Sequence, residues 1–391
     1  MNQKVIIQFI NYSPRIYSGF DRYNLVLARK LVALGYLPVF VFTDSISLVP
    51  LIATDLEAIG AQIELIPTKG NKQLITAYWH LYTKYKPLVV HTHFVEFSKI
   101  ATALFSLLFG SKHFTSFHST ISLLPATDYQ KKKGLIKRVS LLFFYKLLLL
   151  CSNRIFTVSE AIKDQFLDFA SSHSSKIQKL YLGVDLKKNE KTQTELRSYL
   201  QLPQDIVLLC NISAFEPIKG LDIMCKAVFI LKNKYKVQNF KFCHLGGLRS
   251  EDNISKTYRD SIYALAKELD IENEINWLGH RNDIGDIVSA FDIYVHPSRM
   301  EGLGVANMEA ATQSLPIVGT NVGGIPEIVL NGVNGYLFES ENAEQLAECI
   351  FKLIKDKALR EKMGEASYKI VSENFSIEKQ TDALIDYYNL K

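Results

Sequence analysis

The chain of 391 residues lacks a hydrophobic run long enough to cross a membrane. Its longest apolar stretch, SLLFFYKLLLLC at 140–151, is interrupted by Lys146, whereas a membrane-spanning helix needs about 20 apolar residues. Near the N-terminus, the apolar segment Val5–Ile10 is followed at once by Asn11 and is too short for a secretory signal. We therefore expect a protein that is neither secreted nor membrane-spanning.

Paired cysteines and a glycine-rich cofactor motif are also missing. The five cysteines, at 151, 210, 225, 243 and 349, include no C-x-x-C pair, which favours buried thiols in a reducing cytoplasm over disulfides or a zinc site. No G-x-G-x-x-G follows the first predicted strand, which argues against a dinucleotide-binding dehydrogenase. The net charge of +5 does not imply a nucleic-acid partner, although a diphosphate or an anionic membrane surface is compatible with it.

What the chain does contain is a globular composition and a regular alternation of elements. Hydrophobic residues make up 48% and charged residues 22%, and this length exceeds what one hydrophobic core usually holds, so two domains are expected. Short apolar strands alternate with amphipathic helices in both halves, which predicts parallel, doubly wound α/β sheets. The charged stretch KKNEKTQTE at 187–195 is predicted to be a linker and surface loop between the halves.

The stretch 291–338 carries the strongest functional signal. Its strand DIYVHPS leads into the loop SRMEGLG and then into a helix that begins near Val305. Gly302 and Gly304 can adopt conformations that residues with a Cβ resist. The amides of Gly302, Leu303 and Gly304 are expected at the helix N-terminus, where aligned peptide dipoles favour an anion such as phosphate.

Two carboxylates, Glu301 and Glu309, bracket this predicted phosphate cradle. Each can accept hydrogen bonds from hydroxyl groups on either side of a diphosphate, and a sugar nucleotide carries hydroxyls on both sides. A bare glutamate pair would more often be two solvated residues on a surface helix. Here HPS precedes the pair, and P-x-V, GG-x-PE and NG-x-NG-x-L follow it in order. This series resembles the retaining glycosyltransferases of family 4, also called group 1 glycosyltransferases.

The resemblance covers nearly the whole chain and implies the GT-B architecture, an α/β fold of two doubly wound Rossmann-like domains that face a central cleft. It divides the chain into an N-terminal acceptor domain (1–185), a C-terminal domain that binds the nucleotide sugar (186–374), and a last helix (375–391) that crosses back to the N-terminal domain.

The resemblance also implies site residues in both domains. Gly19, at the first strand-to-helix turn, would approach the donor diphosphate, and His118 would lie near the donor sugar and the reaction centre. Lys219, in the KG pair after a strand, would meet the phosphates. Ala214 stands where the family expects an arginine, so the usual pair of cations is reduced to one.

Other positions are expected to border the nucleotide or to be structural. Gly246 follows a strand that ends near the nucleotide, and His280 and Arg281 are expected to border the base. We interpret His91 and His93, at the end of another strand, as structural hydrogen-bonding residues. The candidate site therefore consists of Gly19, His118, Lys219, Gly246, His280, Arg281, Glu301, Glu309 and the glycine turn 302–304, without His91 and His93.

The implied activity is the transfer of a sugar from a nucleotide diphosphate sugar to an acceptor hydroxyl, without cofactor or metal. The absence of Asp-x-Asp, the metal-holding signature of the other main glycosyltransferase architecture, fits a metal-free reaction. The acceptor would be a glycan or a lipid-linked molecule in bacterial-type polysaccharide or glycolipid assembly. A nucleotide-sugar epimerase on the same fold and a non-catalytic scaffold that binds nucleotide sugars remain alternatives.

A contact with the inner face of the cell membrane is a further expectation. The basic cluster at 131–138 precedes the apolar stretch 140–151, and segment 131–150 would then form a basic, apolar face against anionic lipid. The plainer interpretation of the same segment is a core helix with a solvated basic end.

Overall fold

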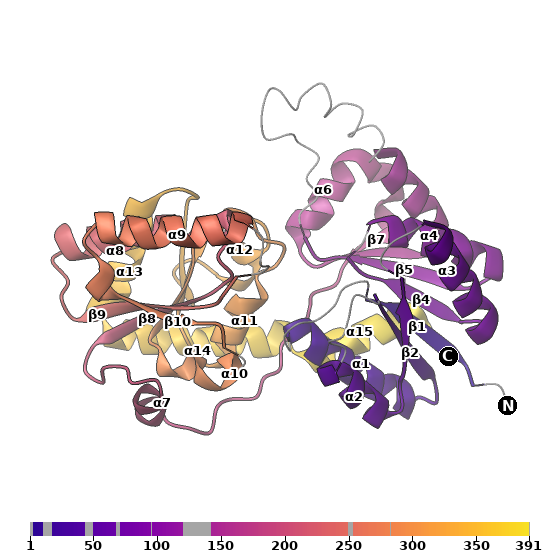
Figure 1. Cartoon of the computed structure of the whole chain (residues 1–391), viewed down its shortest axis with the longest axis horizontal. Coiled ribbons are helices and arrows are strands. Elements are labelled where there is room, and N and C mark those ends of the chain that lie inside the picture. Colours follow the sequence, from indigo (N-terminus) through magenta and orange to yellow (C-terminus); the bar gives the residue numbers. More distant parts are fainter. Residues whose placement is uncertain are drawn as a thin grey trace. The chain divides into compact units, whose positions relative to one another are not determined.

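The computed structural model divides the chain into two units, residues 1–183 with 377–391, and residues 184–376 (Figure 1). It describes residues 3–10, 18–43, 50–67, 71–94, 96–119, 142–248, 253–281 and 283–390. Each unit is built around one parallel sheet with helices on both faces, so the predicted pair of doubly wound α/β domains is confirmed.

The first unit contains a sheet of seven strands in the order β3-β2-β1-β4-β5-β6-β7. The strands are β1 (Val5–Phe9), β2 (Leu37–Thr43), β3 (Gln62–Ile66), β4 (Val89–Thr92), β5 (Lys112–Phe117), β6 (Arg154–Thr157) and β7 (Ile177–Lys179). The helices are α1 (Gly19–Ala33), α2 (Pro50–Ile59), α3 (Asn71–Tyr85), α4 (Glu96–Phe109), an unlabelled helix at 142–151, α6 (Glu160–Ala170) and α15 (Ile377–Tyr388).

Side chains of β1 show why its sequence is apolar at nearly every position. Ile6 points into a cluster with residues of α1 and α15, whereas Val5, Ile7 and Phe9 point into a second cluster with residues of α3 and α4. A parallel strand covered by helices on both faces has no solvent-facing side, so it reads as a continuous hydrophobic run. Figure 1 shows α1 and α15 on one side of this sheet and α3 and α4 on the other.

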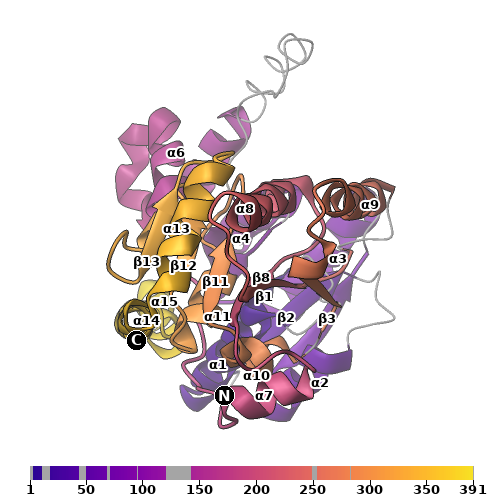
Figure 2. The same cartoon turned by 90° about the vertical axis from the view of Figure 1, so that its left-hand side faces the viewer.

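The second unit contains a sheet of six strands in the order β10-β9-β8-β11-β12-β13. The strands are β8 (Val207–Ile212), β9 (Phe240–Leu245), β10 (Ile275–Gly279), β11 (Ile293–His296), β12 (Ile317–Thr320) and β13 (Gly335–Phe338). The helices are α7 (Gln193–Tyr199), α8 (Leu221–Asn233), α9 (Asn253–Glu268), α10 (Ile284–Ile287), α11 (Val305–Thr312), α12 (Ile325–Ile328), α13 (Ala343–Lys355) and α14 (Lys357–Asn374). In Figure 2, β13, β12, β11 and β8 follow one another across the view.

The strand order places a reversal beside the first strand of each unit. β1 lies between β2 and β4, and β8 lies between β9 and β11. At such a reversal the loops leave the carboxyl ends of neighbouring strands in opposite directions and open a crevice, which is where ligands of doubly wound sheets bind. The loops after β1 and β4 in the first unit, and after β8 and β11 in the second, lie at these reversals.

Two details of local structure differ from the sequence-based expectations. In the stretch 187–195, predicted as a loop, Gln193 already begins α7, because Thr192 and Glu195 form a capping box that starts a helix. In the glycine turn, Gly304 has a φ of +87°, whereas Gly302 is not among the described residues with positive φ. Gly304 therefore adopts a backbone conformation that a residue with a Cβ would resist, and Gly302 does not.

Candidate active site

Lys219 and Glu301 meet at the carboxyl ends of β8 and β11. Lys219 closes the short 3-10 turn Pro217–Lys219 after β8, and its Nζ lies 2.8 Å from Oε2 of Glu301 in the loop after β11. Both side chains are largely buried, with 23% and 18% of their surface exposed. The sequence-predicted cation and carboxylate therefore form one ion pair, across 82 positions of sequence.

Glu301 is held as a carboxylate by its neighbours. Burial alone would raise its pKa, but the hydrogen bond and the charge of His296, followed by the charge and hydrogen bond of Lys219, outweigh burial and lower the pKa to about 2. His296 Nε2 lies 3.1 Å from the same Oε2, and since a carboxylate only accepts, this nitrogen carries a proton. Nδ1 of the same ring lies 3.1 Å from the hydroxyl of Tyr294.

The pair leaves donor and acceptor capacity unused. Lys219 has three N–H donors, and one of them is taken by Glu301. Within the described chain, Oε1 of Glu301 has no hydrogen-bond partner, because both recorded bonds go to Oε2. A ligand at this position could therefore donate a hydroxyl to Glu301 and present an anion to Lys219.

The loops that carry the pair are fastened to each other. The amide of Arg299 donates to the carbonyl of Ile218 at 2.8 Å, and the Arg299 guanidinium pairs with both oxygens of Asp222 at 2.8 and 2.7 Å. The loops come so close at Gly220 that a Cβ there would lie 2.0 Å from the carbonyl oxygen of Pro297. The KG pair thus needs its glycine so that the lysine can face Glu301.

The glycine turn after Glu301 forms the N-terminus of α11. Gly304 is the N-cap residue in a left-handed conformation, and no side chain caps this end of the helix. Asn307, in the first turn, is fully buried, and neither its amide nitrogen nor its oxygen has a hydrogen-bond partner among the described residues. Unused backbone amides and a buried, unpaired amide side chain therefore gather next to Glu301.

Glu309 and the residues predicted to border the base are placed as follows. Glu309 is half-buried on α11. Burial and the Cys210 thiol raise the pKa of Tyr294 most, and the charge of Glu309 adds to this effect. The amide of Gly246 donates to the carbonyl of Gly279 at 2.8 Å, so Gly246 and His280 both lie at the carboxyl ends of β9 and β10.

Arg281 is committed to a local ion pair. Its guanidinium pairs with Asp283 at 2.8 and 2.7 Å, and this contact, ahead of burial, raises the pKa of Arg281. The hydroxyl of Tyr199 is a third neighbour at 3.3 Å. The charge of Arg281 is therefore largely neutralised within its own loop.

The predicted residues of the first unit lie at the carboxyl ends of β1 and β5. Gly19 is the first residue of α1, and Ser18 caps this helix in a capping box with Asp21. His118 follows β5, where its Nε2 lies 2.9 Å from Nδ1 of His93. The loop 11–17 that joins β1 to Gly19 lies outside the described residues.

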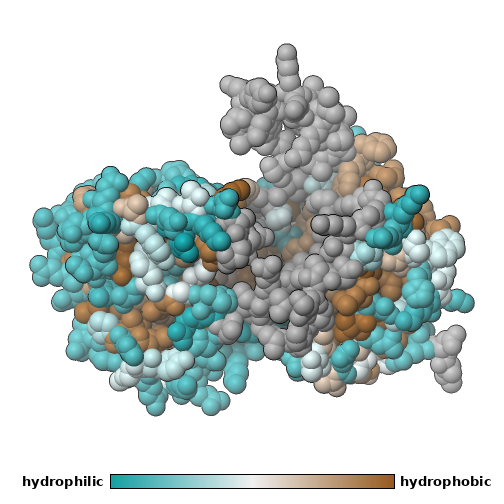
Figure 3. Space-filling model, viewed as in Figure 1, coloured by the Kyte–Doolittle hydropathy of each residue, from teal (hydrophilic) through white to brown (hydrophobic). Residues whose placement is uncertain are grey.

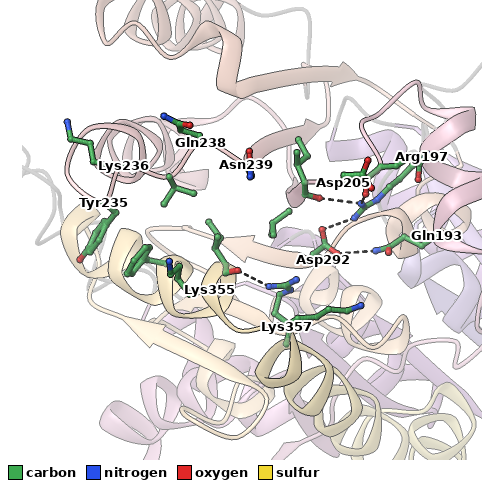
Figure 4. Close-up of a pocket in the computed structure, with 17 residues that line it drawn as sticks. Gln193, Arg197, Asp205, Tyr235, Lys236, Gln238, Asn239, Asp292, Lys355 and Lys357 are labelled. Atoms are coloured by element: carbon green, nitrogen blue, oxygen red, sulfur yellow. Dashed lines mark hydrogen bonds and ion pairs between the residues drawn. The ribbon is translucent and has the colours of Figure 1, made fainter.

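A separate pocket of about 650 Å³ opens at the opposite edge of the second sheet (Figure 4). It is lined by residues next to the amino ends of β8 and β9, including Asp205 and Asn239. The guanidinium of Arg197 in its wall is paired with Asp292 at 2.7 Å and donates to the carbonyls of Ala290, Gln204 and Ile206. We assign this pocket no part in the chemistry, because its buried charge already serves to tie α7 to the sheet.

Sequence reasoning missed several residues of this site. His296 belongs to the HPS motif and Arg299 follows it, so their proximity to Glu301 in sequence was the available signal. Asn307 lies inside the motif, but nothing in the sequence distinguishes a buried polar side chain from a solvated one. The contact between Arg299 and Asp222 spans 77 positions and leaves no local pattern.

Two family models match the chain. The model described as Glycosyltransferase Family 4 matches residues 17–188, and the model described as Glycosyl transferases group 1 matches residues 192–370. The two matches meet where the structure changes from its first unit to its second.

Curated relatives match over parts of their length. The capsular polysaccharide biosynthesis glycosyltransferase CapM of Staphylococcus aureus is 26% identical over 249 residues, which are 62% of this chain and 63% of that protein. The N-acetyl-alpha-D-glucosaminyl L-malate synthase of Bacillus anthracis is 34% identical over 119 residues, 30% of this chain and 31% of that protein. The chain thus spans between about a third and two thirds of these relatives.

Among solved structures, HepE of Anabaena in complex with UDP superimposes with a TM-score of 0.80 at 18% sequence identity, covering 98% of this chain and 99% of that one. This likeness confirms the predicted GT-B fold. With both of its halves matched by family models, the chain belongs to the group 1 glycosyltransferases of family 4.

Proposed function

We propose that the protein is a retaining glycosyltransferase that moves a hexose or related sugar from a nucleotide diphosphate sugar to an acceptor hydroxyl. The observation that carries this proposal is the Lys219–Glu301 pair beside the uncapped N-terminus of α11. The Anabaena protein HepE has been crystallised with UDP and with UDP-glucose, which supports a uridine diphosphate sugar as the first donor to test.

The reaction breaks the bond between the anomeric carbon of the sugar and a diphosphate oxygen. Negative charge develops on the departing diphosphate, and fixed donors aimed at that charge lower the barrier. The unused N–H groups of Lys219 and the amides of Gly302, Leu303 and Gly304 supply such donors. The proton of the acceptor hydroxyl passes to the departing phosphate oxygen on the same face, so the new bond keeps the anomeric configuration.

Glu301 acts on the sugar and Glu309 on the ribose in this proposal. Glu301 stays ionised at every working pH, because its pKa is about 2, and its open Oε1 can accept from a sugar hydroxyl. Glu309 lies further along α11, so it can reach a hydroxyl pair on the nucleoside side of the diphosphate. We propose that no metal is needed, because Lys219 and the α11 amides provide the positive charge.

The acceptor is proposed to be a glycan or a lipid-linked molecule in polysaccharide or glycolipid assembly, as the name of the relative CapM suggests. An epimerase on the same fold would release a changed sugar without an acceptor. A scaffold would bind UDP-sugar and turn nothing over. Product analysis with and without acceptor separates these three functions.

A contact with an anionic membrane is part of the proposal for a lipid-linked acceptor. Residues 131–141 of the segment proposed for this contact lie outside the described residues. In the helix at 142–151, Tyr145, Leu148 and Leu149 are buried, while Phe143 and Leu150 are 70% and 65% exposed. Figure 3 shows hydrophobic surface on the part of the view occupied by the first unit. No helix in the described ranges is long and apolar enough to span a membrane.

The two glutamates should play separable roles. Glu301→Ala should abolish most of the turnover while UDP still binds, because the lost carboxylate contacts the sugar. Glu309→Ala should weaken UDP binding by at least roughly tenfold, because one hydrogen bond to a charged group contributes about 1.5 to 3 kcal/mol. Calorimetric titration with UDP and initial rates with UDP-sugar measure both. Equal UDP affinity in the wild type and Glu309→Ala would overturn the assignment.

Lys219→Ala should lower kcat by about ten- to a hundredfold, since a lost charge-assisted hydrogen bond to the diphosphate costs about 1.5 to 3 kcal/mol. Lys226→Ala, which removes an exposed lysine from α8, serves as the control and should leave kcat unchanged. Ala214→Arg in the Lys219→Ala background should restore part of the rate, because it supplies the missing cation. A kcat for Lys219→Ala within twofold of the wild type would contradict this role.

Binding to membranes should depend on salt and on the exposed apolar residues. Sedimentation with anionic vesicles should pellet the protein at low salt, because each basic residue near the surface contributes about 1 kcal/mol. Phe143→Ser should reduce the pelleted fraction, whereas Phe229→Ser, at a partly exposed position of the second unit, should not. If the wild type stays in the supernatant at low salt, the core-helix interpretation of 131–150 is correct.

A further inference from the structure

A chain of hydrogen bonds runs through the first unit from the last helix to His118. The hydroxyl of Tyr388 on α15 lies 2.9 Å from Nε2 of Gln8 on β1. Oε1 of Gln8 lies 3.2 Å from Nε2 of His93, and Nδ1 of His93 lies 2.9 Å from Nε2 of His118. Gln8, His93 and Tyr388 are buried. Their hydrogen bonds are therefore not exchanged with bulk water.

The direction of each bond follows from the chemistry of Gln8. Its carbonyl oxygen can only accept, so Nε2 of His93 must carry a proton. Nδ1 of a neutral His93 is then an acceptor, and Nε2 of His118 must donate to it. At the other end, the Gln8 amide donates to the Tyr388 hydroxyl. His118 is thereby the tautomer protonated at Nε2, with a lone pair on Nδ1.

A second branch of the chain agrees with these directions. Nδ1 of His91 lies 2.6 Å from the Tyr388 hydroxyl, which has a proton to give after it has accepted from Gln8. Nε2 of His91 then carries a proton and donates to Oγ of Ser116 at 2.8 Å. Every proton between His118 and Ser116 is accounted for without a conflict.

Aromatic neighbours hold the ring of His118 in place, but its Nδ1 makes no hydrogen bond within the described residues. Phe94 stacks on the ring with the centroids 4.5 Å apart, and Phe20 meets it edge-on at 5.1 Å. Nδ1 is buried and has no hydrogen-bond partner among the described residues. A buried acceptor without a partner costs about 1 to 3 kcal/mol, so such a group in a native structure calls for an explanation.

We propose that Tyr388, acting through Gln8 and His93, fixes His118 as the neutral tautomer protonated at Nε2 and so keeps Nδ1 as an acceptor for a substrate hydroxyl. Tyr388, Gln8 and His93 are positioning residues for this function. The part that concerns substrate rests on the proposed glycosyltransferase reaction and on the family resemblance, which implies that His118 lies near the donor sugar. The tautomer itself does not depend on that reaction.

We call the chain of hydrogen bonds from Tyr388 through Gln8 and His93 to His118 the relay. It depends on two conditions, the charge state of the two histidines and the orientation of the Gln8 amide. Burial, and after it the charge of Lys99, lower the pKa of His118 to about 3, and burial lowers the pKa of His93 well below its usual value. Both rings are therefore neutral near pH 7. If the Gln8 amide were turned over, every bond would reverse and Nδ1 of His118 would become a donor. The Tyr388 hydroxyl couples the Gln8 amide to His91, because in the orientation found here it accepts from Gln8 and donates its one proton to His91.

The tautomer can be measured in the wild-type protein by long-range proton–nitrogen correlation NMR of its histidine rings. The His118 signals, assigned with His118→Gln, should show a protonated Nε2 and a bare Nδ1 from pH 8 down to about pH 5, far above the pKa of about 3. A protonated Nδ1, or comparable amounts of both tautomers, would overturn the proposal. This result stands whether or not any sugar donor is turned over.

Tyr388→Phe removes the hydroxyl and keeps the ring in the core. Both tautomers of His118 should then appear, and kcat should fall roughly three- to tenfold, the worth of one neutral hydrogen bond, with KM for the donor unchanged. Tyr387→Phe is the matched control on the same helix, because among the described residues the Tyr387 hydroxyl hydrogen-bonds to Gln178 alone, at 3.5 Å. It should keep the wild-type tautomer and kcat.

The outcomes separate the relay from the proposed function. A wild-type tautomer and unchanged kcat in folded Tyr388→Phe would overturn the relay, while the roles of Lys219 and Glu309 could still hold. Should Tyr388→Phe fail to fold, Gln8→Leu tests the same link, and the wild-type tautomer decides the matter without a variant. A normal tautomer in Gln8→Leu would also overturn the relay.

Discussion

The ion pair between Lys219 and Glu301 is the constraint on which the candidate site of the second unit depends. It joins the loop after β8 to the loop after β11. The same two loops are also connected by the ion pair of Arg299 with Asp222 and by the close approach of Gly220 to the Pro297 carbonyl. Because these groups are in place before a ligand arrives, the positive charge need not be reorganised when a diphosphate leaves. His296 and Lys219 outweigh burial in lowering the pKa of Glu301, and this keeps the pair charged.

In the first unit, buried polar groups of β1 and β4 form hydrogen bonds with Tyr388 on the last helix, α15. α15 belongs to this unit, and its Leu384 and Tyr388 are buried against residues of α1 and β1. The hydroxyl of Tyr388 brings hydrogen-bonding capacity into an otherwise apolar interface, where polar networks persist when every member is satisfied. Nδ1 of His118 is the exception among the atoms of this network, and its position after β5 is the one that the family resemblance associates with the sugar.

Local patterns made much of the fold predictable. The alternation of apolar strands and amphipathic helices predicted both parallel sheets, because strands covered by helices on both faces are apolar at nearly every position. The glycine turn and the helix at Val305 were also predictable, since strand, loop and helix are contiguous. The exception at Gln193–Glu195 arose because a capping box outweighed the polar composition of the segment.

The contacts that tie distant segments together could not be predicted in the same way. Lys219 was selected through resemblance, yet its ion pair with Glu301 depends on the packing of two strands. His93 was interpreted as a structural residue, and its hydrogen bond to His118 appears only once β4 and β5 are adjacent. Asn307 carries no local sign of burial. In each case the contacts or the burial depend on residues far away in sequence.

We propose that protein groups alone neutralise the donor diphosphate. Calorimetric titration of the wild-type protein with UDP in excess EDTA, repeated with Mg²⁺ or Mn²⁺, tests it most directly. We expect a dissociation constant in EDTA within about twofold of that with metal, because Lys219 and the α11 amides supply the charge. Binding that disappears in EDTA and returns with either ion would contradict it.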